Sequence, residues 1–139
     1  MTAFPRKTNH VLLGMAAAAG MAIGAVCAAA PVSAQSGAQA TTRDGVYSTA
    51  QAERGQMVFD EKCRDCHTAA MWGSAWDGKS VGDVFEYIGQ YMPEPAPGTL
   101  SPRQTRDVVA FLLKSNALPA GSTELPDTLE AMKAIRMMK

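Results

Sequence analysis

The sequence predicts a small all-α fold with three to four helices. Capping residues precede segments whose apolar side chains recur at helical spacing, and no segment shows the alternation of apolar and polar residues that is typical of a strand. The chain has 139 residues, of which 47% are hydrophobic and 6% aromatic. This composition allows one small domain and no more.

The first two helices are each predicted by a serine cap. One helix is expected over residues 49 to 62, where Ser48 and Gln51 form a capping-box pattern. A second is expected over residues 81 to 90, after Ser80. Its apolar side chains have the spacing of one buried stripe, made of Val81, Val84, Phe85 and Ile88.

A third helix is expected between Ser101 and Asn116. Pro102 suits its first position, and Gln104 completes a capping box with Ser101. The apolar face of this helix comprises Val108, Val109, Phe111, Leu112 and Leu113. A weaker fourth helix is expected from about residue 128 to residue 137, capped by Asp127.

The first 34 residues have the pattern of a secretory signal peptide. They contain a basic start, an uncharged apolar run and a small-residue cleavage site that ends at Ala34. If the run stays uncleaved, it tethers the domain to a membrane. Both outcomes put the folded part in the periplasm, after export by the Sec route.

The remaining chain divides into a lead and one domain. Residues 35 to 45 are rich in small and polar side chains, so we expect a flexible lead. We expect the domain over residues 46 to 139, with its core in residues 46 to 116 and a C-terminal extension in residues 117 to 139.

Removal of the signal peptide leaves few charges and few metal-binding side chains. Without Arg6 and Lys7, 11 of the 13 basic residues remain against 13 acidic ones, a composition that does not indicate binding to nucleic acid or an anionic membrane. Of three cysteines and two histidines, only Cys63, Cys66 and His67 remain.

These three residues form a C-x-x-C-H motif, the pattern of covalent haem attachment. Cysteines three apart on one helical turn point the same way, so both sulfurs reach the vinyl groups at one haem edge and His67 lies under the iron. A disulfide between Cys63 and Cys66 would close a very small loop. Zinc needs four ligands, and a thioredoxin-like redox pair needs a βαβ pattern that is missing. We therefore expect one covalent haem c, with His67 as an axial ligand.

The second axial ligand is expected to be a methionine, because the exported chain has no other histidine. Among its six methionines, Met92 alone lies on a proline-stiffened loop between two helices. Met57 lies within a helix, Met71 is close to His67 in sequence, and apolar methionines in a terminal helix are usually core residues. That last group contains Met132, Met137 and Met138.

These residues together resemble class I monohaem cytochrome c over about residues 46 to 116. The resemblance rests on Gly55 and Phe59 in the first helix, the haem motif, Met92-Pro93, and the segment from Asp107 to Leu112. It implies that the methionine at Met92 is the distal ligand and that the first and last helices cross through Gly55, Phe59 and the Phe111 face. The tail, with Leu118-Pro119-Ala120-Gly121, also resembles small cytochromes that accompany periplasmic quinoprotein dehydrogenases.

The sequence departs from that family after the haem motif. Members usually have a glycine after the histidine and then a proline whose carbonyl orients the ring, whereas here Thr68 follows and no proline occurs before Pro93. The partner of the His67 ring is therefore left open. Trp72 and Trp76 occupy this segment, and either a hydrogen bond to a haem propionate or packing alone would explain them.

Ligation by His67 and Met92 would raise the haem potential and leave no iron site for a substrate. We therefore expect a non-enzymatic electron carrier with redox proteins as partners, for example a periplasmic dehydrogenase and a terminal oxidase. One alternative is a haem subunit that relays electrons within a quinoprotein dehydrogenase complex. Another is a five-coordinate haem that reduces peroxide or senses a gas.

Overall fold

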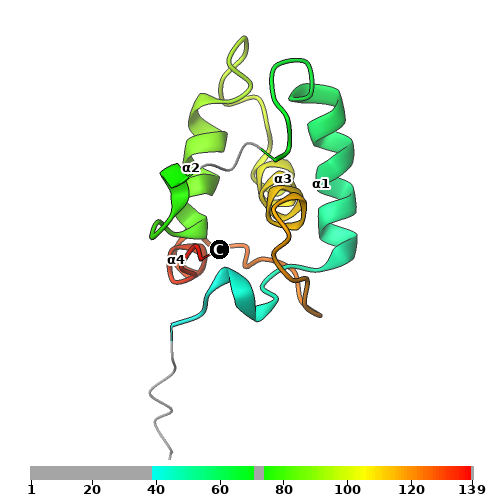
Figure 1. Cartoon of the computed structure of the whole chain (residues 1–139). Coiled ribbons are helices and arrows are strands. Elements are labelled where there is room, and N and C mark those ends of the chain that lie inside the picture. The colour runs from blue at the N-terminus through cyan, green and yellow to red at the C-terminus, as the bar shows by residue number, and fades with distance from the viewer. Residues whose placement is uncertain (1–38, 71–73, 139) are drawn as a thin grey trace, which may run out of the picture. The chain divides into compact units, whose positions relative to one another are not determined.

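The structure is a computed structural model that describes residues 39–70 and 74–138. In this part of the chain, four α-helices and two 3-10 helices occur and no strand is formed (Figure 1). The all-α prediction is therefore confirmed. None of the described helices is long and apolar enough to cross a membrane. The expected signal peptide, Met71 and Trp72 lie outside the described residues.

Helices α1 (Thr49–Lys62) and α3 (Pro102–Ser115) pack against each other and form the centre of the domain. They cross at Gly55, where a Cβ would overlap the backbone carbonyl oxygen of Asp107. One turn further along α1, the ring of Phe59 lies 5.2 Å from that of Phe111, measured between centroids. The crossing positions agree with those that the family resemblance implies.

The N-terminus of α1 differs in one respect from the predicted capping box. The Ser48 hydroxyl accepts a hydrogen bond from the Gln51 N–H, as expected. The Gln51 side chain does not return this bond to Ser48; it is fully buried and accepts from the backbone N–H of Leu125. A residue predicted as a local cap therefore also holds the C-terminal extension against α1.

Helices α2 (Val81–Tyr91) and α4 (Leu129–Lys133) pack together on the other side of α3. The approach is close at Gly82, where a Cβ would meet the backbone nitrogen of Lys133 at 2.8 Å. Helix α4 is shorter than predicted, and its cap is Thr128 rather than Asp127. It ends early because the following residues make backbone hydrogen bonds with other segments of the chain instead of helical ones.

The end of the expected lead belongs to the folded part of the chain. Thr42–Asp44 forms the 3-10 helix η1, capped by Thr41, and Thr42 is fully buried. The hydroxyl of Thr42 donates to the carbonyl of Met138 at 2.8 Å and accepts from the Met138 N–H at 2.9 Å. Tertiary contacts with the C-terminus thus order a segment whose composition is typical of a linker.

Candidate functional site

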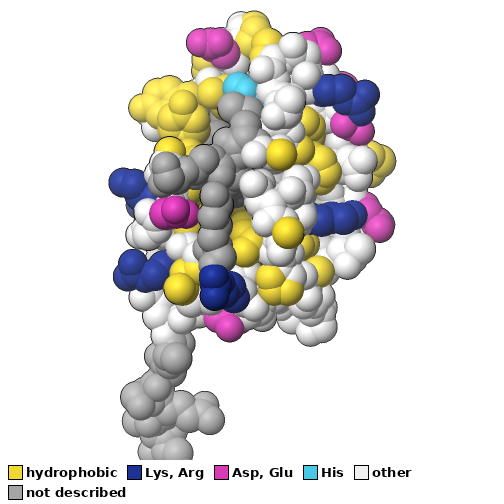
Figure 2. All heavy atoms as spheres, in the orientation of Figure 1, with side chains coloured by type: hydrophobic (Ala, Val, Ile, Leu, Met, Phe, Trp, Pro, Cys, Tyr) yellow, Lys and Arg dark blue, Asp and Glu magenta, His cyan; other side chains and the backbone are white. Residues whose placement is uncertain are grey.

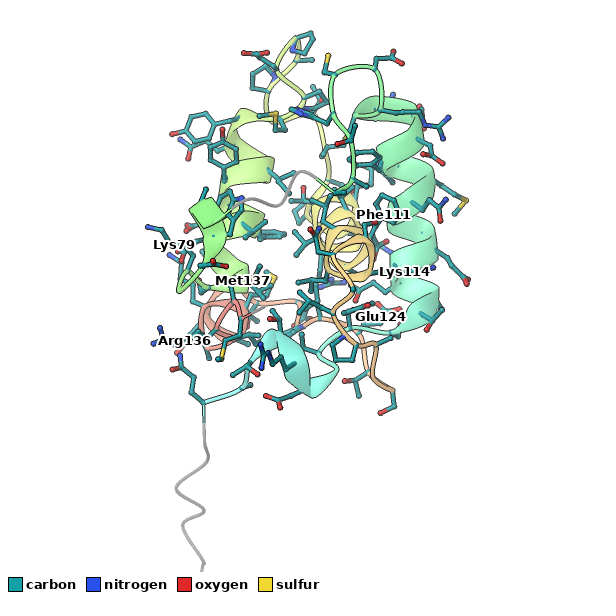
Figure 3. The ribbon with its side chains drawn as sticks, in the orientation of Figure 1. Lys79, Phe111, Lys114, Glu124, Arg136 and Met137 are labelled. Carbon is teal, nitrogen blue, oxygen red and sulfur yellow. The ribbon has the colours of Figure 1, made fainter. Side chains whose placement is uncertain are left out.

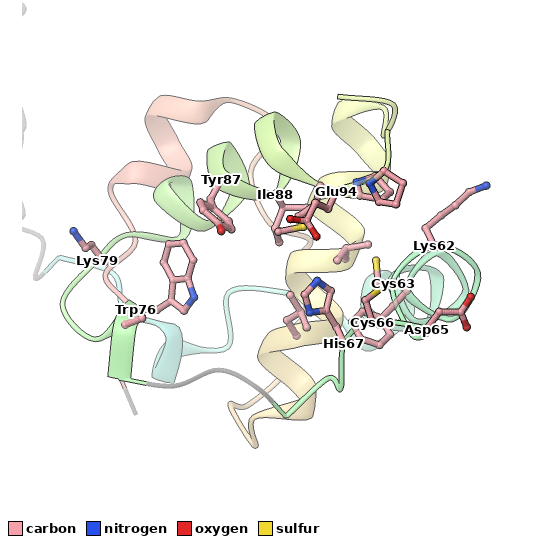
Figure 4. Close-up of a pocket in the computed structure, with 17 residues that line it drawn as sticks. Lys62, Cys63, Asp65, Cys66, His67, Trp76, Lys79, Tyr87, Ile88 and Glu94 are labelled. Carbon is pink, nitrogen blue, oxygen red and sulfur yellow. The ribbon is translucent and has the colours of Figure 1, made fainter. Parts of the chain in front are cut away.

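A cavity of about 740 Å³ lies between the end of α1, the segment before α2, the C-terminal half of α2 (with the loop after it) and one face of α3 (Figure 4). Ligand sites in proteins commonly occupy roughly 300–1,000 Å³. The predicted residues Cys63, Cys66, His67 and Met92 all line it. Most of the remaining wall is apolar, with Phe59, Ala75, Trp76, Ile88, Pro93, Pro95, Val108 and Leu112.

The motif Cys63 to His67 is a turn that continues α1 directly. The N–H of Cys63 still donates to Phe59, and the N–H groups of Cys66 and His67 both donate to the carbonyl of Cys63, at 3.2 and 2.9 Å. This winding brings both sulfurs and the imidazole to the same wall of the cavity. Burial raises the pKa of the Cys63 thiol, so the uncharged form of this sulfur is favoured there.

Met92 reaches the cavity from a different element. It is the C-cap of α2, has an extended backbone, and precedes Pro93. Among the other described methionines, Met57 is 65% exposed on α1, whereas Met132 and Met137 are buried in the core. None of these lines the cavity. Met92 is therefore the one methionine among the described residues that lines the cavity.

The segment after His67 is held by α3. Asn116, just beyond the end of α3, donates from its side-chain nitrogen to the carbonyl of Ala69 at 3.2 Å. Within residues 39–70 and 74–138, no hydrogen bond to the His67 ring is formed. The orienting partner expected from the family is therefore not found among the described residues.

The end of the cavity away from the cysteines carries a second set of residues. Figure 4 shows Cys63, Cys66 and His67 at one end, with Trp76 and Lys79 at the other. Trp76 lies in the 3-10 helix η2 (Ser74–Trp76), and its ring meets that of Tyr87 edge-on, at 5.5 Å between centroids. Trp76 is a candidate from the sequence, whereas Lys79 and Tyr87 belong to no motif and could not be predicted from it.

Exposed aromatic side chains continue from this wall onto the surface. Tyr87 contacts Tyr91 one turn along α2, at 5.2 Å between ring centroids, and the two residues are 44% and 50% exposed. In the space-filling view, hydrophobic side chains gather over α2 (Figure 2). The charged side chains that line the cavity balance in number, with Lys62 and Lys79 against Asp65 and Glu94.

The residues around the cavity suit a haem. The apolar walls suit its macrocycle, and the two cysteines suit its vinyl groups. A haem carries its two propionates on the edge opposite the vinyl positions, and the cation Lys79 lies at the end of the cavity away from the cysteines (Figure 4). An imidazole and a thioether, from His67 and Met92, are typical axial ligands of cytochrome haems.

Comparison with known proteins identifies the central part of the chain. Residues 50–112 match the family model described as cytochrome C oxidase, cbb3-type, subunit III. This segment is a cytochrome c domain. Its cofactor is haem c, attached through a motif of the C-x-x-C-H type, and members of the cytochrome c family are typically electron carriers rather than enzymes. No curated protein and no solved structure gives a significant match.

The match covers the parts of the cytochrome c domain that form the crossing of α1 and α3 and most of the cavity wall. It ends before the last residues of α3. The C-terminal extension lies outside the match, although it packs against α1 and α2.

Proposed function

We propose that this chain is a periplasmic electron carrier whose haem c is bound through Cys63 and Cys66 and ligated by His67 and Met92. The observation that carries the proposal is that all four side chains line one cavity, although they come from two separate elements. When bound, the haem supplies a single-electron couple between ferrous and ferric iron. The chain's own residues would hold it, and His67 and Met92 would ligate its iron.

Ligation of the iron by two residues of the chain would favour electron transfer over substrate chemistry. Phe59, Ile88 and Val108, each no more than 8% exposed, form the buried part of the cavity wall, whereas several other lining residues are exposed. If His67 and Met92 both bind the iron, the site would have no open position for a substrate. The redox partners would dock over the cavity mouth, where the balanced charges provide little electrostatic steering.

The decisive variant is Met92→Ala in the haem-loaded protein. We expect loss of the Met-to-iron charge-transfer band in the oxidised spectrum and a lower reduction potential. The matched control is Met57→Ala, which removes a methionine that is 65% exposed and should leave both properties as in the wild type. An unchanged spectrum in Met92→Ala would contradict the assignment of the ligand.

Two further measurements test the rest of the proposal. Mass spectrometry of the exported protein should give the mass of residues 35 to 139 plus one haem, and the bare mass would contradict covalent attachment. Carbon monoxide should bind slowly or not at all to the reduced wild type. Rapid binding would instead indicate an open axial position and favour a five-coordinate haem.

A further inference from the structure

We propose that residues 135–138 form a positioning element. It holds in place the wall of the haem cavity that carries Trp76 and Lys79, and thereby sets the polarity around the haem. The inference rests on the proposed function, since it concerns the same cavity. It adds a role for residues that the match to the family model does not include. Figure 3 labels Arg136 and Met137 on this segment and Lys79 ahead of α2, and Lys79 lines the cavity.

Backbone hydrogen bonds join this segment to the start of α2 and the residues just before it. The N–H of Val81 donates to the carbonyl of Ile135 at 2.9 Å, and the N–H of Met137 donates to the carbonyl of Lys79 at 2.8 Å. The N–H of Gly78 also donates to Met137, at 3.4 Å. The turn from Trp76 to Lys79 is closed by a further bond from the Lys79 N–H to the Trp76 carbonyl.

On its other side, the segment is anchored to residues 40–42. The N–H of Arg136 donates to Ala40 at 2.8 Å, and its carbonyl accepts from Thr42 at 3.0 Å. Arg136 thus forms bridges both to Thr41 and to Ser80. We call this arrangement of residues 40–42, 79–81 and 135–138 the three-segment junction, in which the C-terminal segment is the middle member.

The side chains at the junction are buried, so the junction can support the cavity wall. Ile135 and Met137 are each 5% exposed, and Thr42 is fully buried. Half-buried Trp76 packs against the core that contains Ile135 and Met137. A wall built on such a support keeps the partly buried Trp76 in place at the end of the cavity that carries Lys79.

The functional consequence follows from the environment of the haem. The shell around a metal site controls solvent access and local dielectric, and these properties set the reduction potential. If the junction loosens, water reaches the Trp76 wall and favours the more highly charged ferric state. The potential should then fall, even though no ligand and no residue of the cavity lining has changed.

The test uses Thr42→Val in the full, haem-loaded protein. This nearly isosteric change removes both hydrogen bonds between Thr42 and Met138 and lies outside the cavity lining. The matched control is Thr105→Val, because Thr105 is 1% exposed and donates its hydroxyl to the carbonyl of Ser101, the N-cap of α3, outside the junction. A second variant ends at Met137 and therefore lacks Met138, the partner of Thr42 in both hydrogen bonds.

We expect Thr42→Val and the truncated chain to have a lower potential than the wild type, while Thr105→Val keeps the wild-type value. Amide hydrogen exchange at Gly78 and Val81 should be accelerated severalfold in the two junction variants, relative to Val109 in α3. Equal potentials and exchange rates in Thr42→Val and Thr105→Val would overturn the inference. A wild type without covalent haem would contradict the proposed function instead, so the two failures are distinguishable.

Discussion

Gly55 of α1 faces the backbone carbonyl of Asp107 on α3, with no room between them for a side chain. The two helices approach closely here because a glycine has no Cβ. Both backbones are part of regular helices, so neither can move aside alone. This contact sets the angle and depth at which α3 enters the domain, and α3 in turn supplies Val108 and Leu112 to the cavity wall.

Gly55→Ala should therefore destabilise the protein by about 3 kcal/mol, the upper range for adding a methyl group to a packed core. The expected change would appear as a lower midpoint in urea denaturation of the haem-loaded protein. Gly89→Ala is the matched control, because a Cβ there meets only Thr105 at 3.8 Å and alanine favours the helix by about 0.5–1 kcal/mol. Equal midpoints for the two variants would rule out close packing at Gly55.

The ion pair between Arg54 and Asp107 supports the same crossing. Arg54 donates to both carboxylate oxygens at 3.0 Å and to Glu124 of the C-terminal extension at 2.7 Å. The Asp107 side chain is only 5% exposed, so Arg54→Met should leave a poorly paired buried charge and cost about 2 kcal/mol. Glu86→Gln, which breaks an exposed pair with Lys133, should cost less than about 1 kcal/mol. Similar losses of unfolding free energy in both variants, measured by urea denaturation, would contradict a larger contribution from the buried pair.

The cap of α2 should make stability depend on acid pH. Asp83 accepts a hydrogen bond from the Ser80 N–H at 2.8 Å, and this bond is the main cause that lowers the pKa of the Asp83 carboxyl. A carboxyl with a lowered folded-state pKa stabilises the fold above its ordinary value of about 3.9, and this contribution is lost as the pH falls through the folded-state value.

Asp83→Asn should therefore reduce the loss of stability that the wild type shows below about pH 4, measured as the unfolding free energy against pH. Asp127→Asn serves as the control, because Asp127 accepts no hydrogen bond within the described part of the chain. If the acid limb of the curve is the same in wild type and Asp83→Asn, the cap does not contribute to it.

Lys79 should affect the haem through its charge at the end of the cavity away from the cysteines. Lys79→Gln removes that cation, so we expect a lower potential and a shifted pH dependence of the potential, measured by redox titration. Lys62→Gln removes a cation next to the cysteines that is already paired with Glu61 at 2.8 Å. It should produce the smaller change. An equal change in both variants would argue against a propionate site at Lys79.

Local patterns were enough to predict three of the helices and the chemistry of the motif. Caps and apolar spacing depend on residues within a few positions of each other, so α1 was predicted with its observed bounds, and α2 with only a small difference at its end. The spacing of Cys63, Cys66 and His67 likewise depends on a single turn. The prediction for Met92 followed from elimination, and its role as a ligand stays a prediction.

The tertiary structure decided the parts that depend on residues far apart in the sequence. Thr42 lies in a linker-like segment, and its contacts with Arg136 and with Met138, 96 positions away, hold it in the fold. Helix α4 ends early because the carbonyl of Ile135 accepts from Val81 instead of continuing a helix. The sequence by itself therefore determined the helices and the haem motif. Only the tertiary structure decided which other side chains line the cavity beside the haem motif. The physical reason is that contacts between residues far apart in the sequence form only when the core packs.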